Sequence, residues 1–327
     1  MTTSEKRTRI WLDGCFDSGH FAHFNAVRQA LTLVPSELPV HITVGVHSDA
    51  EILKNKGPPL FGERERYDVI RGCRWVDQVV EDVPYVTQLS TIDQYNIDFV
   101  VHGDDPVLDA DGNDCYAFAK AAGRYVECKR TAGISTTSLI ERILHPDKPR
   151  ISSEEPLREL LRAFSQSATP NVPVLTGEKA VLPEEFPATR ALTCGAWDCF
   201  GAGHVELLRR AREAGGGSLI VGVWDDATVE EVTGEKPLLA HLERALALVQ
   251  CRHVDAVILH FPRTPSLSLL SSLGVSNVVT FGETYDADTS IKVLTVDCPP
   301  LQTVALLREK VHAQLQLFED RQRRKGA

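Results

Sequence analysis

The sequence lacks an excess of basic residues. Its 327 residues carry a formal net charge of −10 at pH 7. This charge argues against a general nucleic-acid-binding protein, which needs a basic surface to displace counterions. An acidic chain can still bind an anion locally, through backbone amides and a few arginines. We therefore expect no nucleic-acid partner.

The sequence also lacks long apolar runs and close cysteine pairs. No stretch approaches the roughly 20 apolar residues that span a bilayer, and residues 1–9 lack the apolar core of a signal peptide. None of the eight cysteines forms a C-x-x-C pair, and most lie in apolar runs. This pattern predicts buried free thiols rather than disulfides or a zinc site. We expect a soluble, cytoplasmic protein without a transmembrane segment.

What the sequence does contain is an internal repeat. Gly14-Cys-Phe-Asp17 returns as Gly195-Ala-Trp-Asp198, and three further blocks return in the same order. Those blocks are 43–46 with 220–223, 65–77 with 243–255, and 99–103 with 278–282. The period is far longer than that of a solenoid repeat. The sequence therefore predicts two copies of one domain.

Prolines are dense between the two copies. They occur at positions 146, 149, 156, 170, 173, 183 and 187. Proline at this density disfavours continuous helix or sheet, apart from one short helix at 157–164. We expect a catalytic domain at 1–145, a proline-rich linker at 146–188 and a degenerate second copy at 189–327.

Short apolar strands alternate with helices within the first copy. Strands are expected at 10–12, 40–46, 76–80, 99–101 and 124–128, and helices at 23–34, 64–73 and 136–144. Such alternation predicts an α/β fold, in which each copy is a Rossmann-like parallel sheet with helices on both faces. Ligands bind at the carboxyl ends of the strands in such sheets, where the notable residues of this chain lie.

Two histidines follow the first predicted strand. His20 and His23 lie three residues apart at a helix start, so their side chains point to the same side. Each imidazole can donate a hydrogen bond to a phosphate oxygen, and the helix N-terminus adds free amides and a favourable dipole. The spacing alone leaves a metal site or two surface histidines open, but the position after a glycine-ended strand favours phosphate binding.

Around these histidines the chain resembles the cytidylyltransferase family. The H-x-G-H loop of that family appears as His20-Phe-Ala-His23, and its R-T-x-G-I-S-T-T signature is complete at 130–137. Further matches lie at 56–59, 65–67, 73–77, 84–85 and 102–104. The resemblance covers residues 9–145, and the two-copy arrangement is similar to that of the members acting on phosphoethanolamine.

The resemblance implies transfer of CMP from CTP to phosphoethanolamine, with release of pyrophosphate. The catalytic residues it implies are His20, His23, Lys56 and Arg130. The CTP-binding residues it implies are Cys15, Phe16, Gly103, Asp104, Arg130, Thr131, Gly133, Ile134, Ser135 and Thr136. Lys56 and Tyr85 are expected to bind the phosphoethanolamine. Mg²⁺ is expected to accompany CTP, held mainly by phosphates and water rather than by a protein metal site.

Several positions depart from the family pattern. Ala22 replaces the loop glycine and is expected to lower efficiency by crowding the nucleotide. Tyr85 and Val107 stand where choline enzymes usually carry tryptophan and tyrosine, which favours a primary amine. In the second copy Gly201 replaces the first histidine, and no arginine signature occurs between 293 and 307. We expect that copy to be catalytically inactive, with a packing or regulatory role.

Other functions remain open at this point. A related nucleotidyltransferase could act on phosphocholine or glycerol phosphate, or use ATP. A class I aminoacyl-tRNA synthetase shares the histidine loop, but the chain has no K-M-S-K-S element and no basic RNA-binding domain. A non-catalytic nucleotide sensor is the third alternative. The sequence also leaves a homodimer open.

Overall fold

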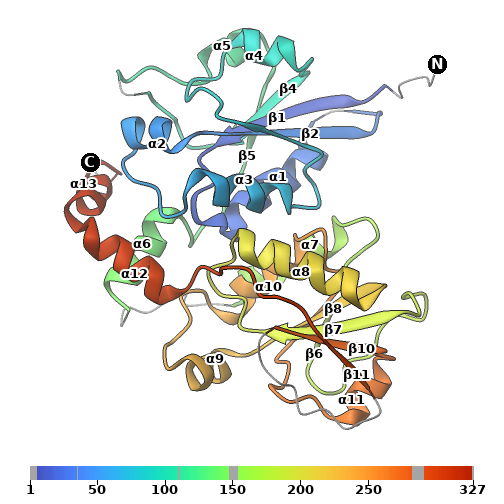
Figure 1. Ribbon diagram of the computed structural model, residues 1–327. Helices are drawn as coiled ribbons and strands as arrows, with labels where there is room; N and C mark the ends of the chain where they lie inside the picture. The colour runs from blue at the N-terminus through green and yellow to red at the C-terminus, as the bar shows by residue number, and fades with distance from the viewer. Residues whose placement is uncertain (1–5, 35, 110, 147–153, 282–290, 326–327) are drawn as a thin grey trace. The chain divides into compact units, whose positions relative to one another are not determined.

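The computed structural model divides the chain into two compact units (Figure 1). Unit 1 is Met1–Glu141 with Glu309–Ala327, and unit 2 is Arg142–Arg308. The structure describes residues 6–34, 36–109, 111–146, 154–281 and 291–325. Within these ranges, no helix has the length and apolar character needed to cross a membrane.

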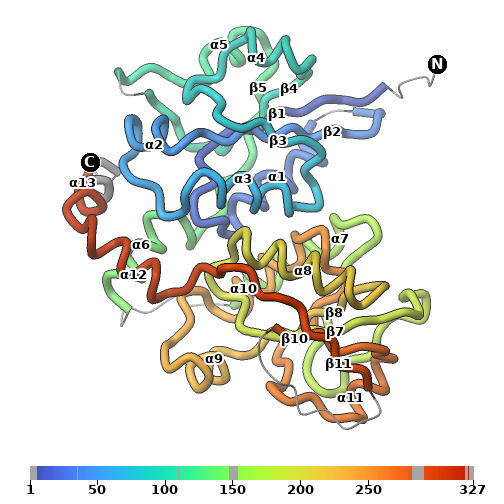
Figure 2. Tube along the Cα trace, viewed as in Figure 1, coloured from blue at the N-terminus to red at the C-terminus, as the bar shows by residue number. Residues whose placement is uncertain are grey.

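Unit 1 contains a five-stranded parallel sheet of order β3-β2-β1-β4-β5. Its strands are β1 (Thr8–Gly14), β2 (Val40–Val46), β3 (Gln78–Glu81), β4 (Phe99–Gly103) and β5 (Tyr125–Cys128). Its helices are η1 (Asp17–Gly19), α1 (Phe21–Leu33), α2 (Asp49–Asn55), α3 (Glu63–Arg71), α4 (Leu89–Gln94), α5 (Ala117–Ala121), the start of α6 (Thr136–Leu144), the end of α12 (Val304–Ala313) and α13 (Leu315–Lys325). The alternation can be followed along the trace in Figure 2.

Helices cover both faces of this sheet. Helices α1 and α3 lie on one face, and α4 and α5 lie on the other (Figure 1). Trp11 is fully buried beneath α4 and α5, against Ile92 of α4 and Ala119 of α5. The predicted α/β fold is confirmed, and every strand and helix predicted for this copy is present with slightly shifted ends. The short helices α2, α4 and α5 were not predicted from the sequence pattern.

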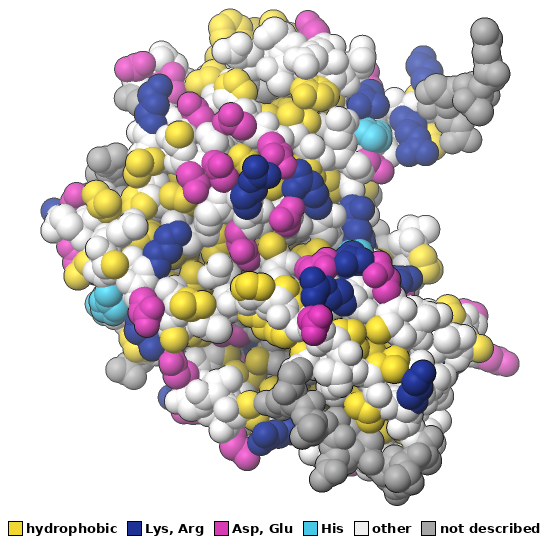
Figure 3. Space-filling view, in the orientation of Figure 1, with side chains coloured by type: hydrophobic (Ala, Val, Ile, Leu, Met, Phe, Trp, Pro, Cys, Tyr) yellow, Lys and Arg dark blue, Asp and Glu magenta, His cyan; other side chains and the backbone are white. Residues whose placement is uncertain are grey.

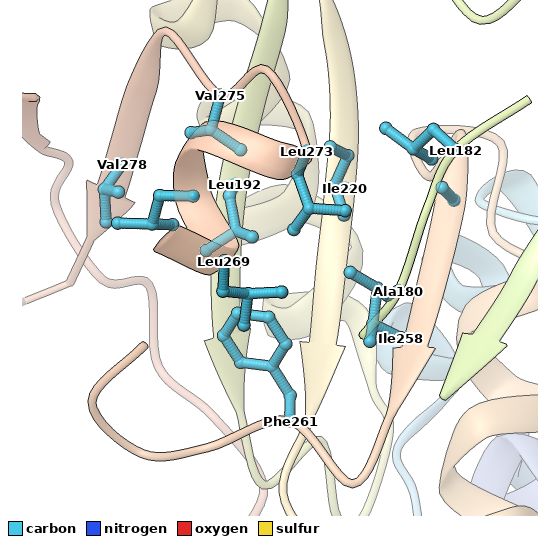
Figure 4. Packing of buried hydrophobic residues seen from close by; sticks show 12 residues of the cluster. Ala180, Leu182, Leu192, Ile220, Ile258, Phe261, Leu269, Leu273, Val275 and Val278 are labelled. Carbon is cyan, nitrogen blue, oxygen red and sulfur yellow. The ribbon is translucent and has the colours of Figure 1, made fainter. Parts of the chain in front are cut away.

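Unit 2 repeats this architecture with six parallel strands in the order β11-β10-β7-β8-β9-β6. Its strands are β6 (Val174–Thr176), β7 (Arg190–Gly195), β8 (Ser218–Val223), β9 (Ala256–Leu259), β10 (Asn277–Thr280) and β11 (Lys292–Thr295). Its helices are the end of α6, α7 (Glu155–Gln166), α8 (Ala202–Gly215), α9 (Asp226–Thr233), α10 (His241–Val249), α11 (Leu267–Ser272) and the start of α12. Figure 4 shows Leu269 of α11 and Leu273 packing onto Leu192 and Ile220 of the sheet.

The proline-rich segment is more ordered than the sequence indicated. It contains α7, which includes the short helix expected at 157–164, and strand β6, which pairs with β9. Its prolines are compatible with these elements because Pro156 lies in the first turn of α7 and Pro173 directly precedes β6. The expectation that proline excludes a strand here is therefore wrong. The domain limits themselves stay a prediction.

Equivalent buried contacts support the repeat. The Asp17 carboxylate accepts hydrogen bonds from the amides of Leu60 and Phe61, at 3.0 and 2.9 Å. In unit 2 the Asp198 carboxylate accepts an equivalent pair of bonds from two backbone amides. They are Leu238 and Leu239, at 2.6 and 3.0 Å. One carboxylate thus joins the first loop of each sheet to a later loop.

One sequence match of the repeat is shifted by a residue. Phe99 pairs with Ile10 in unit 1, whereas Asn277 pairs with Ala191 in unit 2. Ile10 and Ala191 lie the same number of residues before the repeated glycines, Gly14 and Gly195. Phe99 therefore corresponds to Asn277 rather than to Val278. Gly103 therefore corresponds to Phe281, and Gly282, the residue matched by sequence, lies outside the described residues.

Acidic and basic side chains are interspersed over the surface. On the face drawn in Figure 3 the coloured residues form no continuous basic stripe.

Replacing Arg244 should destabilise unit 2. Its guanidinium is fully buried and donates to the carbonyl oxygens of Leu239, Ala196 and Trp224 and to the Asp226 carboxylate. Arg244→Met leaves these buried acceptors without a donor, so the free energy of unfolding should fall by about 3 kcal/mol.

Urea denaturation of the full chain measures this change. Arg209→Met is the matched control, because Arg209 pairs with Glu206 and Glu213 on the exposed side of α8. An equal, small effect of both substitutions would contradict the structural role given to Arg244.

Candidate functional site

The site is built on a tight loop after β1. Phe16 and Ser18 adopt left-handed backbone conformations, with φ of 48° and 63°, so the chain turns sharply from the strand into α1. The Asp17 carboxylate binds the 60–61 amides, and its carbonyl oxygen accepts a hydrogen bond from Thr136 Oγ1 at 3.2 Å. Asp17 therefore holds the histidine loop, the loop after Lys56 and the start of α6 together.

The two histidines share one wall of the site. His20 and His23 stack with ring centroids 3.8 Å apart and an interplanar angle of 21°. Phe16 packs edge-on against His23 at 5.5 Å. His20 precedes the first turn of α1, and its side chain does not cap that helix start. The amide of His23 donates to the His20 carbonyl at 3.0 Å, and the helix dipole favours an anion at this end of α1.

A cavity of about 200 Å³ opens at the carboxyl ends of β1 and β4. Most predicted site residues line it: Cys15, Phe16, His20, His23, Lys56, Gly103, Arg130, Thr131, Ile134, Ser135 and Thr136. Ala22 and Val107, both singled out as departures from the family pattern, also line the cavity. The predicted residues Asp104, Gly133 and Tyr85 do not line it. The ligand contacts of all these residues stay predictions.

The segment that follows β5 supplies the cationic side of the cavity. The Arg130 guanidinium is exposed and lies 3.3 Å from the Asp105 carboxylate, while its amide donates to Asp104 at 3.0 Å. Asp104 therefore positions the Arg130 backbone in this structure. Gly133 has a φ of 84°, a conformation that favours glycine. The turn thus presents the start of α6 toward the cavity.

Lys56 reaches the cavity from the end of α2. Its Nζ lies 5.4 Å from the ring centroid of Tyr85, a cation–π distance. Tyr85 is buried, and its amide donates to the Glu51 carboxylate of α2 at 3.2 Å. Lys310, from the returning C-terminal segment of unit 1, donates to the Leu60 carbonyl at 2.8 Å. The loop after Lys56 is therefore held from two sides.

Sequence reasoning missed a buried carboxylate in the same cavity. Asp13 is 5% exposed, lines the cavity and accepts hydrogen bonds from Thr87 Oγ1 and, at 2.7 Å, from Tyr116 Oη. Burial is the main cause, and the negative charge of Asp13 the second, that raises the pKa of Tyr116 well above its usual value. The phenol therefore keeps its proton and is the donor. A charged residue ending an apolar strand was the available signal, since such a group is seldom buried without a role.

Two further imidazoles surround this carboxylate. The ring centroid of His47 lies 5.1 Å from that of Tyr85, and His102 lies 4.6 Å from Tyr116, both pairs tilted rather than stacked. Burial lowers the pKa of both histidines, and the negative charge of Asp13 acts in the opposite direction. Both are therefore neutral at pH 7, which leaves Asp13 and Lys56 as the opposite charges of this corner. We refer to Asp13, Tyr85 and Tyr116 as the acceptor corner.

The residues suit phosphate and amine chemistry better than a protein-bound metal. Among the described residues, no three His, Cys, Asp or Glu side chains are grouped so as to hold a metal ion. The cavity instead combines stacked imidazoles, a helix start, an arginine and two lysines with a separate buried carboxylate. Such a site can bind a polyphosphate at one end and a cationic group at the other.

Comparison with known proteins agrees with this geometry. Residues 11–142 and 192–312 both match the family described as cytidylyltransferase-like. The ethanolamine-phosphate cytidylyltransferase of Dictyostelium discoideum is 39% identical, over 86% of this chain and 81% of that protein. The corresponding enzyme of Arabidopsis thaliana is 38% identical, over 84% and 70%. Choline-phosphate cytidylyltransferase 2 of Arabidopsis thaliana is 37% identical, over 50% and 52%. The chain therefore belongs to the cytidylyltransferase-like family.

Proposed function

We propose that unit 1 transfers CMP from CTP to phosphoethanolamine, giving CDP-ethanolamine and pyrophosphate. The observation that carries this proposal is the single cavity in which the phosphate-binding motifs face the buried carboxylate of Asp13. The two relatives that match most of this chain are named as enzymes of ethanolamine phosphate. The relative named for choline phosphate matches only half of it.

The phosphate end of the cavity suits the triphosphate of CTP. His20 and His23 are stacked side by side, so both imidazoles can donate to oxygens around the α- and β-phosphates. Arg130 is exposed at the cavity wall, where its planar guanidinium can bind paired oxygens of the β- and γ-phosphates. Ser135 and Thr136 lie at the start of α6 and line the same cavity. These groups stabilise the charge that develops on the leaving pyrophosphate.

The reaction needs positioning rather than a covalent enzyme intermediate. A phosphate oxygen of phosphoethanolamine attacks the α-phosphorus of CTP, the new P–O bond forms, and the bond to pyrophosphate breaks. Lys56 lies between the phosphate end and the acceptor corner, so it can contact both the α-phosphate and the incoming phosphate. It draws two anions together and offsets their mutual repulsion.

The acceptor corner favours a primary ammonium group. Asp13 retains acceptor positions on its two oxygens, and a primary ammonium has three N–H donors that can reach them. A trimethylated amine has no N–H donor and needs a wider aromatic cage. Tyr85 and Tyr116 belong to the core cluster against which Val107 packs, and Val107, which lines the cavity, adds no aromatic ring there.

Mg²⁺ is proposed to arrive with CTP. The residues present fit this arrangement, because the carboxylates that line the cavity are Asp13, which is hydrogen-bonded in the acceptor corner, and Asp105, which pairs with Arg130. The ion would thus be held by phosphate oxygens and water. When bound, it supplies neutralisation of phosphate charge.

We further propose a cytoplasmic location. All eight cysteines are free thiols, and five of them are buried, which suits a reducing compartment. The homodimer left open by the sequence stays an untested prediction.

The reaction and its substrate are tested by pyrophosphate release from the purified full chain with CTP and Mg²⁺. Phosphoethanolamine should support turnover strongly, and phosphocholine and a no-acceptor control should not. Turnover with phosphocholine at an equal rate would contradict the assignment of the acceptor corner. CTP binding without turnover with any acceptor would favour a nucleotide sensor.

Removing the charge of Asp13 should weaken acceptor binding. Asp13→Asn keeps the shape but loses a charge-assisted hydrogen bond, so the KM for phosphoethanolamine should rise about tenfold or more. The KM for CTP should change little. Steady-state kinetics with each substrate varied in turn measure both values. Asp93→Asn is the control, because Asp93 is exposed and pairs with Arg124. An unchanged KM in Asp13→Asn would refute the role given to Asp13.

Removing the charge of Lys56 should affect the chemical step. Lys56→Met preserves the aliphatic stem and removes the ammonium between the two phosphates, so kcat should fall about a hundredfold. Lys54→Met, in the last turn of α2, is the matched control because Lys54 does not line the cavity. Similar kcat values for the two variants would show that Lys56 is only a solvated lysine.

A further inference from the structure

Unit 2 contains a larger cavity than unit 1, with a volume of about 810 Å³. It opens at the carboxyl ends of β7, β8 and β10 and is lined mostly by apolar side chains. Trp197 and Trp224 both line it, together with Phe281. The proposal of CMP transfer assigns no role to this space.

Backbone contacts show that the two cavities are equivalent. The amide of His47 donates to the Gly14 carbonyl in unit 1, and the amide of Trp224 donates to the Gly195 carbonyl in unit 2. Trp224 therefore occupies the place of His47. The same strand register places Cys194 at the position of Asp13.

A second pair of contacts aligns the next loop. Val83 donates its amide to the Val46 carbonyl, as Phe261 donates to Val223. The residues before them, Asp82 and His260, have nearly identical φ angles of 52° and 51°. Counting two residues onward in each unit places Arg263 where unit 1 has Tyr85.

The acceptor corner has therefore changed the sign of its charge in unit 2. A neutral thiol, Cys194, replaces the carboxylate of Asp13, and the guanidinium of Arg263 replaces the phenol of Tyr85. Lys236 lines the same cavity. Both cations are exposed, and neither forms an ion pair or hydrogen bond among the described residues. The two carboxylates that also line the cavity are engaged elsewhere, Glu235 with Arg308 at 2.9 Å and Asp198 with backbone amides. The two cations therefore make this corner attract an anion rather than an amine.

Two features that suit a nucleotide in unit 1 are changed in the part of unit 2 that the structure describes. Phe281 stands at the place of Gly103 and packs against Trp197 with ring centroids 5.9 Å apart. The segment 296–303, which leads into α12, contains no arginine or lysine. It carries Pro299 and Pro300, which have no amide N–H to offer a phosphate. Among the described residues, unit 2 therefore lacks a counterpart of Gly103 and of the arginine of unit 1, while His204 keeps the place of His23.

We propose that the cavity of unit 2 binds an anionic amphiphile, whose hydrocarbon body lies against Trp197, Trp224 and Phe281 and whose carboxylate or phosphate head faces Arg263 and Lys236. The apolar wall stabilises the body by removing it from water. The two cations recognise the head. This site is distinct from the CTP-binding cavity of unit 1 and does not depend on the function proposed for that unit.

Binding is tested on the full chain with decanoate and decyl phosphate, each below its micelle concentration, and with decanol and decylamine as neutral and cationic controls. Two of the four tryptophans line the cavity, so intrinsic fluorescence reports occupancy and isothermal titration gives the stoichiometry. One anionic amphiphile should bind per chain, and the controls should bind more weakly. Preference for decanoate or for decyl phosphate identifies the head group.

Variants of the cationic rim separate this site from non-specific binding. Arg263→Ala should raise the Kd about tenfold, the value expected for one charge-assisted hydrogen bond, Arg263→Glu should abolish binding, and Arg263→Lys should largely retain it. Lys179→Ala, an exposed lysine outside the cavity, is the control for Lys236→Ala. Circular dichroism confirms that each variant is folded.

Three results would overturn the proposal. They are equal binding of decanol or decylamine, unchanged binding in folded Arg263→Glu, and displacement of decyl phosphate by CTP. The last would place the amphiphile in the cavity of unit 1.

Discussion

The Asp17 carboxylate fixes the geometry on which the rest of the unit 1 site depends. It accepts two backbone amides of the loop after Lys56, and its own carbonyl oxygen receives the Thr136 hydroxyl. Three segments far apart in the sequence are thereby brought to one edge of the sheet. Each carries part of the phosphate chemistry, and none could be positioned by local helix or strand preferences alone. The buried hydrogen bonds are strong here because water is excluded.

The same support persists in unit 2 although the chemistry does not. Asp198 and Arg244 repeat the contacts of Asp17 and Arg66, including an ion pair from each arginine to an aspartate at the start of the preceding helix. What changed are the side chains that face the cavity. The buried contacts that hold the fold together are thus the same in both copies. The residues that face the cavity differ, since unit 2 has one histidine fewer and the opposite charge in its acceptor corner.

The sequence predicted the features that depend on local pattern. Alternating apolar strands and helices gave the α/β fold, and the contiguous motifs around His20 and Arg130 gave the residues that meet in one cavity. The acceptor corner was hidden because its contacts are long-range. Asp13 meets Thr87 and Tyr116 across 74 and 103 residues of sequence. Strand β6 was hidden for a similar reason, since its partner β9 follows much later in the chain.

The most direct test of the account follows the oxygen atoms of the acceptor. Phosphoethanolamine labelled with ¹⁸O in its phosphate is incubated with CTP, Mg²⁺ and the full chain, and the products are analysed by ³¹P NMR and mass spectrometry. Direct attack predicts that label remains on the acceptor phosphorus and appears in the bridging oxygen of CDP-ethanolamine, with none in pyrophosphate. Label in the released pyrophosphate, or a product without labelled bridging oxygen, would contradict attack of the acceptor phosphate on the α-phosphorus of CTP.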